Sequence, residues 1–434
     1  MTPRGTRTRA IASLALLILA ALTIAAILSQ RWVLTAIPIG FLFGFFLQKG
    51  DLCGSAALSE VLVFRDGRKL FGIWTAVVVA MLFFALGDVL GLVTLNPKPM
   101  MWLLFIGGGL IFGAGTVLAG GCVSGCLYKG ATGNLNSIVA LLAMPAGIAL
   151  VEYGPLKPLF QAAKARAIAG PGGAALDLPG LTGLPFWALA LGFGLITLAA
   201  VYLRRHRARG AEPTRSGGDP LLRRLVIQPW KPWQAGLAIG LLALPAYLSS
   251  AASGRNYPLG VTHGVLQVDV LISDSRIDHV YQTPAAAARS RVAAPPTSTA
   301  GPTVAAAPAQ PGKKVVWWLV LVVLGVLGGA LTAGKLSGQA RLLPKPPDQV
   351  LVAIPGGFLV GAGAALATGC IVGNVMSGWA LMSVGTFLFG AAVLIGNWVT
   401  TWLYLMGGTL GGRGRGRSAD AVTAAVRVTA GKDR

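Results

Sequence analysis

The sequence predicts an all-α membrane protein with about nine to ten hydrophobic helices. Hydrophobic residues make up 54% of the 434-residue chain and charged residues only 12%, about half the charged fraction of an ordinary soluble domain. Apolar runs long enough to cross a bilayer, which takes about 20 helical residues, recur along the chain. We therefore expect a single polytopic membrane domain over residues 1–434.

The apolar runs lie near residues 10–28, 32–47, 70–93, 101–119, 135–152, 183–203, 233–252, 315–333, 353–369 and 381–406. The first run follows three arginines and resembles an export signal. Its length, from Ala10 to Leu28, and the absence of a small-x-small cleavage site after it predict a retained helix instead. Several later runs are interrupted by Gly, Pro or a charge. Broken helices at membrane depth are tolerated where they face protein or a water-filled cavity.

Positive charge is concentrated outside the apolar runs. The chain holds 36 Lys and Arg against 14 Asp and Glu, a net charge of +22. The basic segments are residues 204–231 and the tail 411–434. By the positive-inside tendency these segments and the basic N-terminus lie in the cytoplasm, and nucleic acid is not an expected partner. Residues 265–312 are expected to form a flexible linker, since 282–312 is rich in Ala, Pro, Ser and Thr.

One motif occurs twice. Aligning residues 108–130 with 356–378 gives eleven identities in twenty-three positions, among them Cys122 with Cys370. Further upstream, Gly50 to Gly54 aligns with Gly334 to Gly338, so that Ser337 takes the place of Cys53. The repeat predicts two pseudo-symmetric halves, residues 30–205 and 233–410. Such duplication is a recurrent transporter design, although small residues spaced four apart also serve simply to pack helices.

Three of the four cysteines mark glycine-rich breaks in the helices. Cys53, Cys122 and Cys370 each stand between an apolar run and a short following segment. A thiol is a weak donor, suited to a soft sulfur-bearing anion that must pass through without being held tightly. Short helices over residues 123–128 and 371–377 would direct their free amide groups to an anion at the breaks.

Other residues are expected to support this path. Gly121, Gly125, Gly369 and Gly373 let the backbone approach the ion. Lys129 is expected to attract the ion toward the break, and Ser337 occupies the repeat position of Cys53.

Metal and cofactor chemistry fit the sequence poorly. The three histidines lie in loops and no Cys-x-x-Cys motif is present, so we expect no catalytic residue, metal or cofactor. Two alternatives to transport stay open, a membrane thiol-disulfide oxidoreductase and a structural membrane subunit without a substrate. A disulfide enzyme would require a pair of exchangeable cysteines.

At these residues the sequence resembles the YeeE/YedE family of bacterial inner-membrane proteins. The resemblance covers about residues 33–408 and rests on the segments Gln48–Ala57, Gly113–Gly130, Tyr257–Gly264 and Gly361–Gly378. It implies a pseudo-symmetric helical bundle with opposing funnels and central re-entrant loops, and uptake of thiosulfate passed between thiols by hydrogen bonds. Carried over, the relay would consist of Cys53, Cys122 and Cys370. Any delivery partner would then be a separate cytoplasmic sulfur-carrier protein.

Overall fold

The computed structural model describes residues 3–29, 31–170, 175–207, 228–273, 277–281, 313–342, 346–404 and 407. Within these residues nine helical segments are long and apolar enough to cross a membrane, which confirms an all-α, multi-pass membrane protein. Their elements are η1 (Trp32–Thr35), α2 (Ala36–Gly50), α3 (Gly54–Phe64), α4 (Arg68–Val89), α5 (Trp102–Leu118), α6 (Val123–Ala131), α7 (Leu135–Glu152), α10 (Phe186–Arg207), α12 (Pro232–Ala252), α15 (Trp317–Leu336), α16 (Pro347–Leu366) and α17 (Val384–Tyr404).

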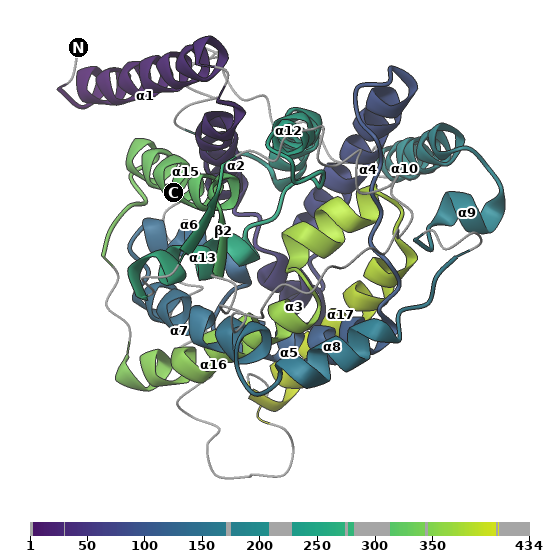
Figure 1. Ribbon diagram of the computed structural model, residues 1–434. Helices are drawn as coiled ribbons and strands as arrows, with labels where there is room; N and C mark the ends of the chain where they lie inside the picture. Colours follow the sequence, from purple (N-terminus) through teal and green to yellow (C-terminus); the bar gives the residue numbers. More distant parts are fainter. Residues whose placement is uncertain are drawn as a thin grey trace, which may run out of the picture.

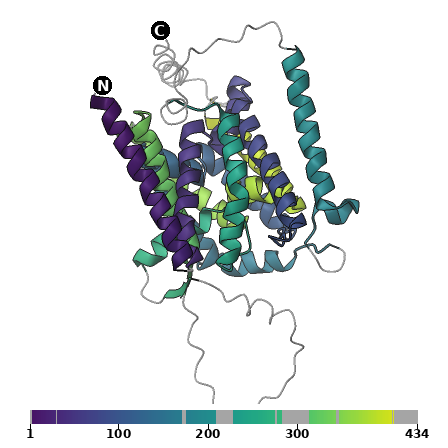
Figure 2. The ribbon, with the colours of Figure 1, turned by 90° about the horizontal axis from the view of Figure 1, so that it is seen from above.

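Shorter elements lie at one end of the bundle (Figures 1 and 2). They are α8 (Lys157–Ala165), α9 (Leu178–Thr182), α13 (Thr262–Ser273), β1 (Ile277–Val280) and β2 (Lys313–Val316), and the long helix α1 (Pro3–Leu28) precedes the bundle. The two strands are parallel, with Ile277 opposite Lys313. The segment expected as a linker from residue 265 thus starts as helix and strand. Its residues 282–312 and the tail 411–434 lie outside the described residues, as do residues 208–227 of the basic loop.

Glycines allow the crossing helices to touch backbone to backbone. Gly40 and Gly44 of α2 lie against the carbonyl groups of Val322 and Val326 in α15. Four glycines of the repeated motif do the same between α5, α7, α16 and α17: Gly113, Gly115, Gly361 and Gly363. A Cβ at any of them would meet neighbouring backbone at less than the normal contact distance. Close packing through small residues replaces the hydrophobic driving force that lipid cannot supply.

The contacts also give the relative directions of α2, α4 and α12. α4 and α12 run the same way, because Gly72 meets Pro232 near their starts and Gly87 meets Leu244 near their ends. α2 runs the opposite way, since Thr35 bonds Ser249 while Gly50 contacts Ala235. We call the side where α4 and α12 begin the Lys69 face, and the side where they end, near α13, the α13 face.

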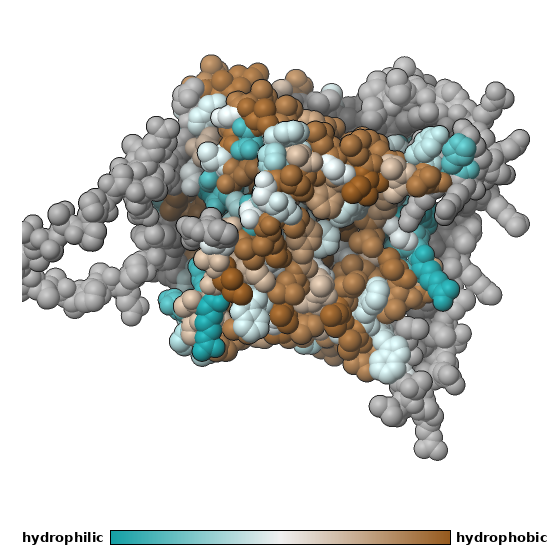
Figure 3. Space-filling view, turned by 90° about the vertical axis from the view of Figure 1, so that its right-hand side faces the viewer, coloured by the Kyte–Doolittle hydropathy of each residue, from teal (hydrophilic) through white to brown (hydrophobic). Residues whose placement is uncertain are grey.

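Between these faces the surface is largely apolar. Figure 3 shows one side of the molecule, on which brown apolar residues dominate the middle and most strongly hydrophilic residues lie toward the left and right margins. Exposed large side chains such as Leu195, Leu198 and Ile395 contribute to it. This is the pattern of a bundle whose outer surface contacts lipid.

Three chain breaks lie inside the bundle. α2 ends at Asp51, which has a left-handed backbone (φ 46°), and α3 begins after Cys53. α5 gives way to α6 through Gly120 (φ 71°), and α16 gives way to the short π-helix η3 (Ile371–Gly378) through Thr368 (φ 52°). A left-handed residue ends a helix. Each of these chain breaks is followed by a cysteine at the start of a new helix.

Candidate substrate pathway

The three cysteines at the breaks are buried in one cluster. Cys53, Cys122 and Cys370 are the residues immediately before α3, α6 and η3, and each side chain is 0% exposed. All three are free thiols and belong to the largest hydrophobic core cluster. The short helices predicted after Cys122 and Cys370 are present as α6 and the π-helix η3, and the first amide groups of a helix have no partner within it.

Cys53 and Cys122 contact each other. Their side chains are within hydrogen-bonding reach, and Gly125 lies beside both. A Cβ at Gly125 would lie 2.5 Å from the Cys53 Sγ and 3.5 Å from the Cys122 Sγ. Cys122 also interacts with the Ser124 hydroxyl at 3.4 Å. The two thiols thus lie next to each other.

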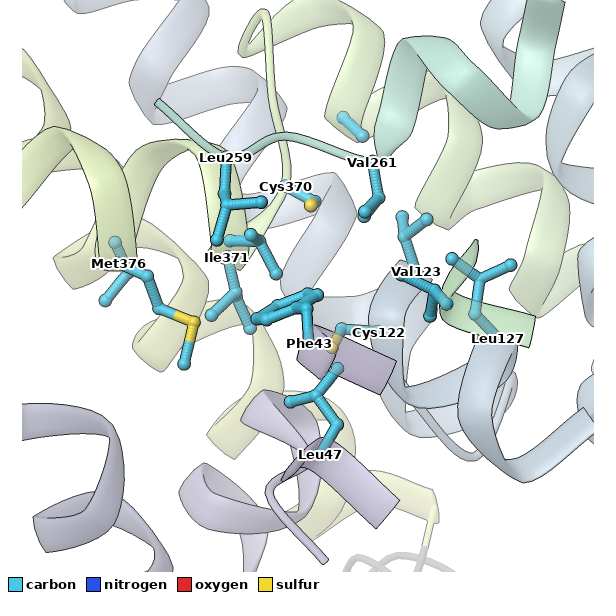
Figure 4. Close-up of a cluster of buried hydrophobic side chains, with 14 of the residues drawn as sticks. Phe43, Leu47, Cys122, Val123, Leu127, Leu259, Val261, Cys370, Ile371 and Met376 are labelled. Carbon is cyan, nitrogen blue, oxygen red and sulfur yellow. The ribbon is translucent and has the colours of Figure 1, made fainter. Parts of the chain in front are cut away.

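Cys370 lies apart from this pair, behind apolar side chains. In Figure 4, Phe43 and Ile371 lie in the region between the thiols of Cys370 and Cys122, with Leu259 and Val261 nearby. Phe43 is fully buried. We call these four side chains the apolar barrier.

A cationic cavity of about 320 Å³ adjoins the Cys370 break. We call it the vestibule; it is lined by Lys98, Arg255, Tyr257, Gly260, Thr262, His263, Gln267, Val316, Leu319, Thr368, Gly369 and Gly373. The Lys98 ammonium donates to the Thr368 carbonyl and to Asn374 Oδ1, each at 2.7 Å. Lys98 is also near enough to Cys370 for an electrostatic interaction.

Arg255 supplies the second positive charge of the vestibule. Its guanidinium donates to the Pro258 carbonyl at 2.8 Å and lies over the rings of Tyr257 and Trp318. Burial lowers the pKa of Arg255 from its ordinary value to about 10. Burial, together with the charge of Arg255, lowers the pKa of Lys98 to about 7. Both groups lack the full solvation of a surface cation, so an anion that enters would be bound favourably.

Two side chains of the vestibule have unused hydrogen-bonding atoms. Thr262 Oγ1 and Gln267 Oε1 are buried without a hydrogen-bond partner among the described residues. The residues are 2% and 8% exposed. A buried polar atom without a partner is costly, and the hydroxyl and the amide NH₂ of a flipped Gln are both donors. The vestibule is therefore equipped to bind a polar ligand.

Hydrogen bonds connect the loop that carries Arg255 to η3. The Tyr257 hydroxyl donates to the Gly373 carbonyl at 2.7 Å, and the Ser377 hydroxyl donates to the Leu259 carbonyl at 2.9 Å. The loop that contains Tyr257 and Leu259 thus positions the helix that follows Cys370.

Charged side chains also gather below Cys53 on the Lys69 face. Asp51 accepts from the Tyr128 hydroxyl and from Lys69, each at 2.7 Å, and Lys69 also bonds Glu60 at 2.7 Å. Lys129 follows Tyr128 in α6 and donates to the Gly120 carbonyl at 3.1 Å. We call this group of five side chains the Asp51 cluster.

The glycines expected to support the substrate path lie near the cysteines or the vestibule, whereas Ser337 does not. Gly369 and Gly373 line the vestibule, Gly125 lies at the Cys53 thiol, and Gly121 precedes Cys122. Ser337 instead ends α15 and bonds the Ala333 carbonyl of its own helix at 2.7 Å. Sequence reasoning did not find Lys98, Arg255, Thr262 or Gln267, because each is a single polar residue without a repeat partner or a fixed spacing.

Comparisons with known proteins identify the family of the chain. Residues 49–399 match the family described as Sulphur transport. The chain is 27% identical over 383 residues to the thiosulfate transporter TsuA of Spirochaeta thermophila, covering 85% of this chain and 98% of that protein. It is also 27% identical over 377 residues to TsuA of Escherichia coli, covering 86% and 94%. The probable transporter YedE of E. coli is 32% identical over only 79 residues, 18% of this chain and 20% of that protein. The match over most of its length shows that this chain belongs to the sulphur transport, or YeeE/YedE, family of membrane proteins.

Proposed function

We propose that this protein imports thiosulfate or a closely related sulfur-containing anion through the bacterial inner membrane. The observation that carries the proposal is the vestibule, which places two cations and two unused polar groups next to Cys370. Further support comes from the relatives named as thiosulfate transporters.

The two ends of thiosulfate suit the two parts of this region. Its three oxygens accept hydrogen bonds, and Lys98, Arg255 and Thr262 supply donors. Its terminal sulfur is soft and polarizable, and the Cys370 thiol is a weak donor to such an atom. The ion would then pass from Cys370 to Cys122 and on to Cys53. Weak contacts favour passage because tight binding slows release.

Direction follows from the distribution of basic residues. α10 ends at Arg207 and α12 starts at Pro232 on the Lys69 face, so the basic segment 204–231 joins two helices there. The positive-inside tendency makes this the cytoplasmic face and places the N-terminus of α1 on the same side. The ion would enter at the vestibule and leave past the Asp51 cluster, where a separate sulfur-carrier protein would receive it.

A second candidate function rests on the contact between Cys53 and Cys122. Two adjacent thiols are also the requirement of a thiol-disulfide oxidoreductase. Such an enzyme would cycle the pair between dithiol and disulfide during turnover, whereas a relay keeps free thiols. Differential alkylation of the protein trapped during uptake distinguishes the two. A disulfide fraction that rises with turnover favours the enzyme.

The direct test is uptake of radiolabelled thiosulfate by cells that lack other sulfur-uptake routes. We expect uptake that depends on this protein, and we expect excess sulfate or selenite to compete less well than unlabelled thiosulfate. Uptake no higher than in cells without the protein, at normal membrane abundance, would overturn the proposal.

A further inference from the structure

A second cavity, separate from the vestibule, lies between α4 and α17. It has a volume of about 580 Å³, and we call it the lateral groove. Its lining is apolar and includes Leu58, Phe71, Trp74, Val77, Val375, Trp379, Phe387 and Leu394. The N–H groups of its two indoles are occupied, since Trp74 donates to the Thr197 hydroxyl and Trp379 donates to the Thr386 carbonyl. The indoles therefore present ring carbon to the groove.

The groove runs along the membrane-spanning part of the bundle. It extends along α4 from Gly67, at the Lys69 face, to Val77, a length of about 15 Å at the helical rise of 1.5 Å per residue. Both α4 and α17 are membrane-spanning helices. A ligand that enters between them at this depth comes from the hydrocarbon of the bilayer, which is the surrounding solvent there.

The end of the groove at the Lys69 face carries two arginines. Arg65, at the end of α3, and Arg68, at the start of α4, flank Gly67, a lining residue of the groove. The Arg68 side chain is 83% exposed and contacts Asp66 at 2.7 Å. Exposed guanidinium groups at the end of a groove on the outside of the bundle can donate to a lipid phosphate, which guanidinium binds well.

The inner wall of the groove is formed by the two cysteine breaks. Gly54 and Ile371, which follow Cys53 and Cys370, both line it. A Cβ at Gly54 would lie 2.5 Å from the Ile371 side chain, so the two breaks touch at this wall. Whatever fills the groove packs against both.

We propose that the lateral groove is a binding site for one acyl chain of a bilayer phospholipid, with the headgroup phosphate at Arg65 and Arg68. The site is independent of the transported ion. It makes a membrane lipid a structural part of the wall that supports the cysteine breaks.

The test uses the two tryptophans of the groove. The protein is loaded with phosphatidylglycerol carrying bromine on its acyl chains, and bulk lipid is then washed away in mild detergent. Bromine quenches indole fluorescence on contact. We expect residual quenching in the wild type that is lost in the Trp74→Phe/Trp379→Phe double variant. The matched control is Trp402→Phe, because Trp402 is 45% exposed on α17 and is not a lining residue. Equal residual quenching in the double variant and the wild type would overturn the site.

Two further variants test occupancy and charge. Ala391→Phe fills the groove from α17, whereas Val399→Phe adds bulk at an exposed position elsewhere on the same helix. Lipid that copurifies, measured by mass spectrometry, should fall at least several-fold in Ala391→Phe and stay unchanged in Val399→Phe. Added phosphatidylglycerol should raise the Tm of the wild type more than that of Ala391→Phe. Arg65→Gln/Arg68→Gln should lower the amount of phospholipid that copurifies, because the phosphate loses both donors. Retained lipid in Ala391→Phe, or an unchanged amount in the arginine variant, contradicts the proposal.

Discussion

Gly125 lies against the Cys53 thiol with no room for a side chain. A Cβ at this position would be 2.5 Å from the sulfur, whereas its repeat counterpart Gly373 has no atom within 4 Å of a built Cβ. The two glycines align in the repeated motif but have different surroundings. One forms the wall of the cysteine pair, and the other borders the vestibule.

This difference predicts unequal effects of the same substitution. Gly125→Ala should displace the Cys53 thiol and reduce thiosulfate uptake about tenfold or more, since overpacking a core costs about 1–3 kcal/mol. Gly373→Ala should fold normally and at most raise the KM, because its methyl group enters open space. Uptake by cells with matched membrane abundance measures both. Equal losses would contradict the assignment of Gly125 to the wall of the thiol pair.

The cysteines themselves provide the next comparison. Cys122→Ala and Cys370→Ala should each abolish growth on thiosulfate as sole sulfur source while the protein stays in the membrane. Cys126→Ala is the matched control. Cys126 is equally buried but bonds the Gly121 carbonyl at 3.5 Å in its own turn, so its loss should be tolerated. Near-normal growth of either relay variant would exclude the relay.

Ser337 and Cys53 test the same repeat position in the two halves. The Ser337 hydroxyl bonds its own helix, so Ser337→Ala should change uptake little and cost about 0.5–1.5 kcal/mol of stability at most. Cys53→Ser should impair uptake clearly, because a hydroxyl lacks the polarizable sulfur. Severe loss in both variants would show that both positions act as small polar packing residues.

The pKa of Lys98 predicts a pH dependence. Lys98 is charged below its pKa of about 7 and neutral above it, so uptake should decline as the pH on the α13 face rises through this range. Arg255, Tyr257 and Cys370 surround Lys98. His263 also lines the vestibule and pairs with Glu152 at 3.0 Å. Arginine stays protonated at these pH values.

Lys98→Arg should therefore flatten the pH profile, while Lys98→Met should raise the KM about tenfold or more through loss of a charged hydrogen bond. His263→Gln separates the contribution of the histidine, which pairs with Glu152. If the pH profile of uptake is unchanged in Lys98→Arg and flat in His263→Gln, then His263 and not Lys98 causes the pH dependence.

The strand pair predicts how short the connection between residues 280 and 313 can be. The register pairs Ile277 with Lys313 and Val280 with Val316. The chain must therefore return by three residue rises and cross one strand spacing, about 11 Å in all. Ten Gly/Ser residues in place of 282–312 reach about 33 Å, so insertion and uptake should be preserved. Loss of uptake with a normal elution profile in detergent would give this segment a role in transport.

Much of the helical framework follows from the sequence. The apolar run at 135–152 coincides with α7, because the cap residue Asn134 and the apolar composition agree. The apolar run at 353–369 is shifted relative to the helix it predicts, since α16 starts at Pro347 and ends at Leu366. The first turn of α16 is polar, so a search for apolar residues does not include it. The left-handed backbone of Thr368 ends the helix before the apolar run ends.

The site was predictable only where the repeat marked it. Cys122 and Cys370 stand out because the motif recurs around them, and glycine-rich sequence indicates the breaks. Lys98 lies between α4 and α5, Arg255 between α12 and α13, and Gln267 within α13. Only the tertiary structure brings them to one cavity. The contact between Cys53 and Cys122 is equally non-local, since it depends on how α2 packs against α6 and α3 against α5.

The apolar barrier has a consequence for the energy supply of the cell. A membrane that stores free energy as an ion gradient must not conduct protons or hydrated ions while it admits nutrients. Phe43, which is fully buried with Leu259 and Val261 nearby, makes a continuous file of water unfavourable between the vestibule and the paired thiols. On the proposed pathway, an ion that crosses would exchange its hydration shell for thiol contacts. The same side chains would then insulate the membrane electrically and favour a large, weakly hydrated sulfur atom over ions that hold water tightly.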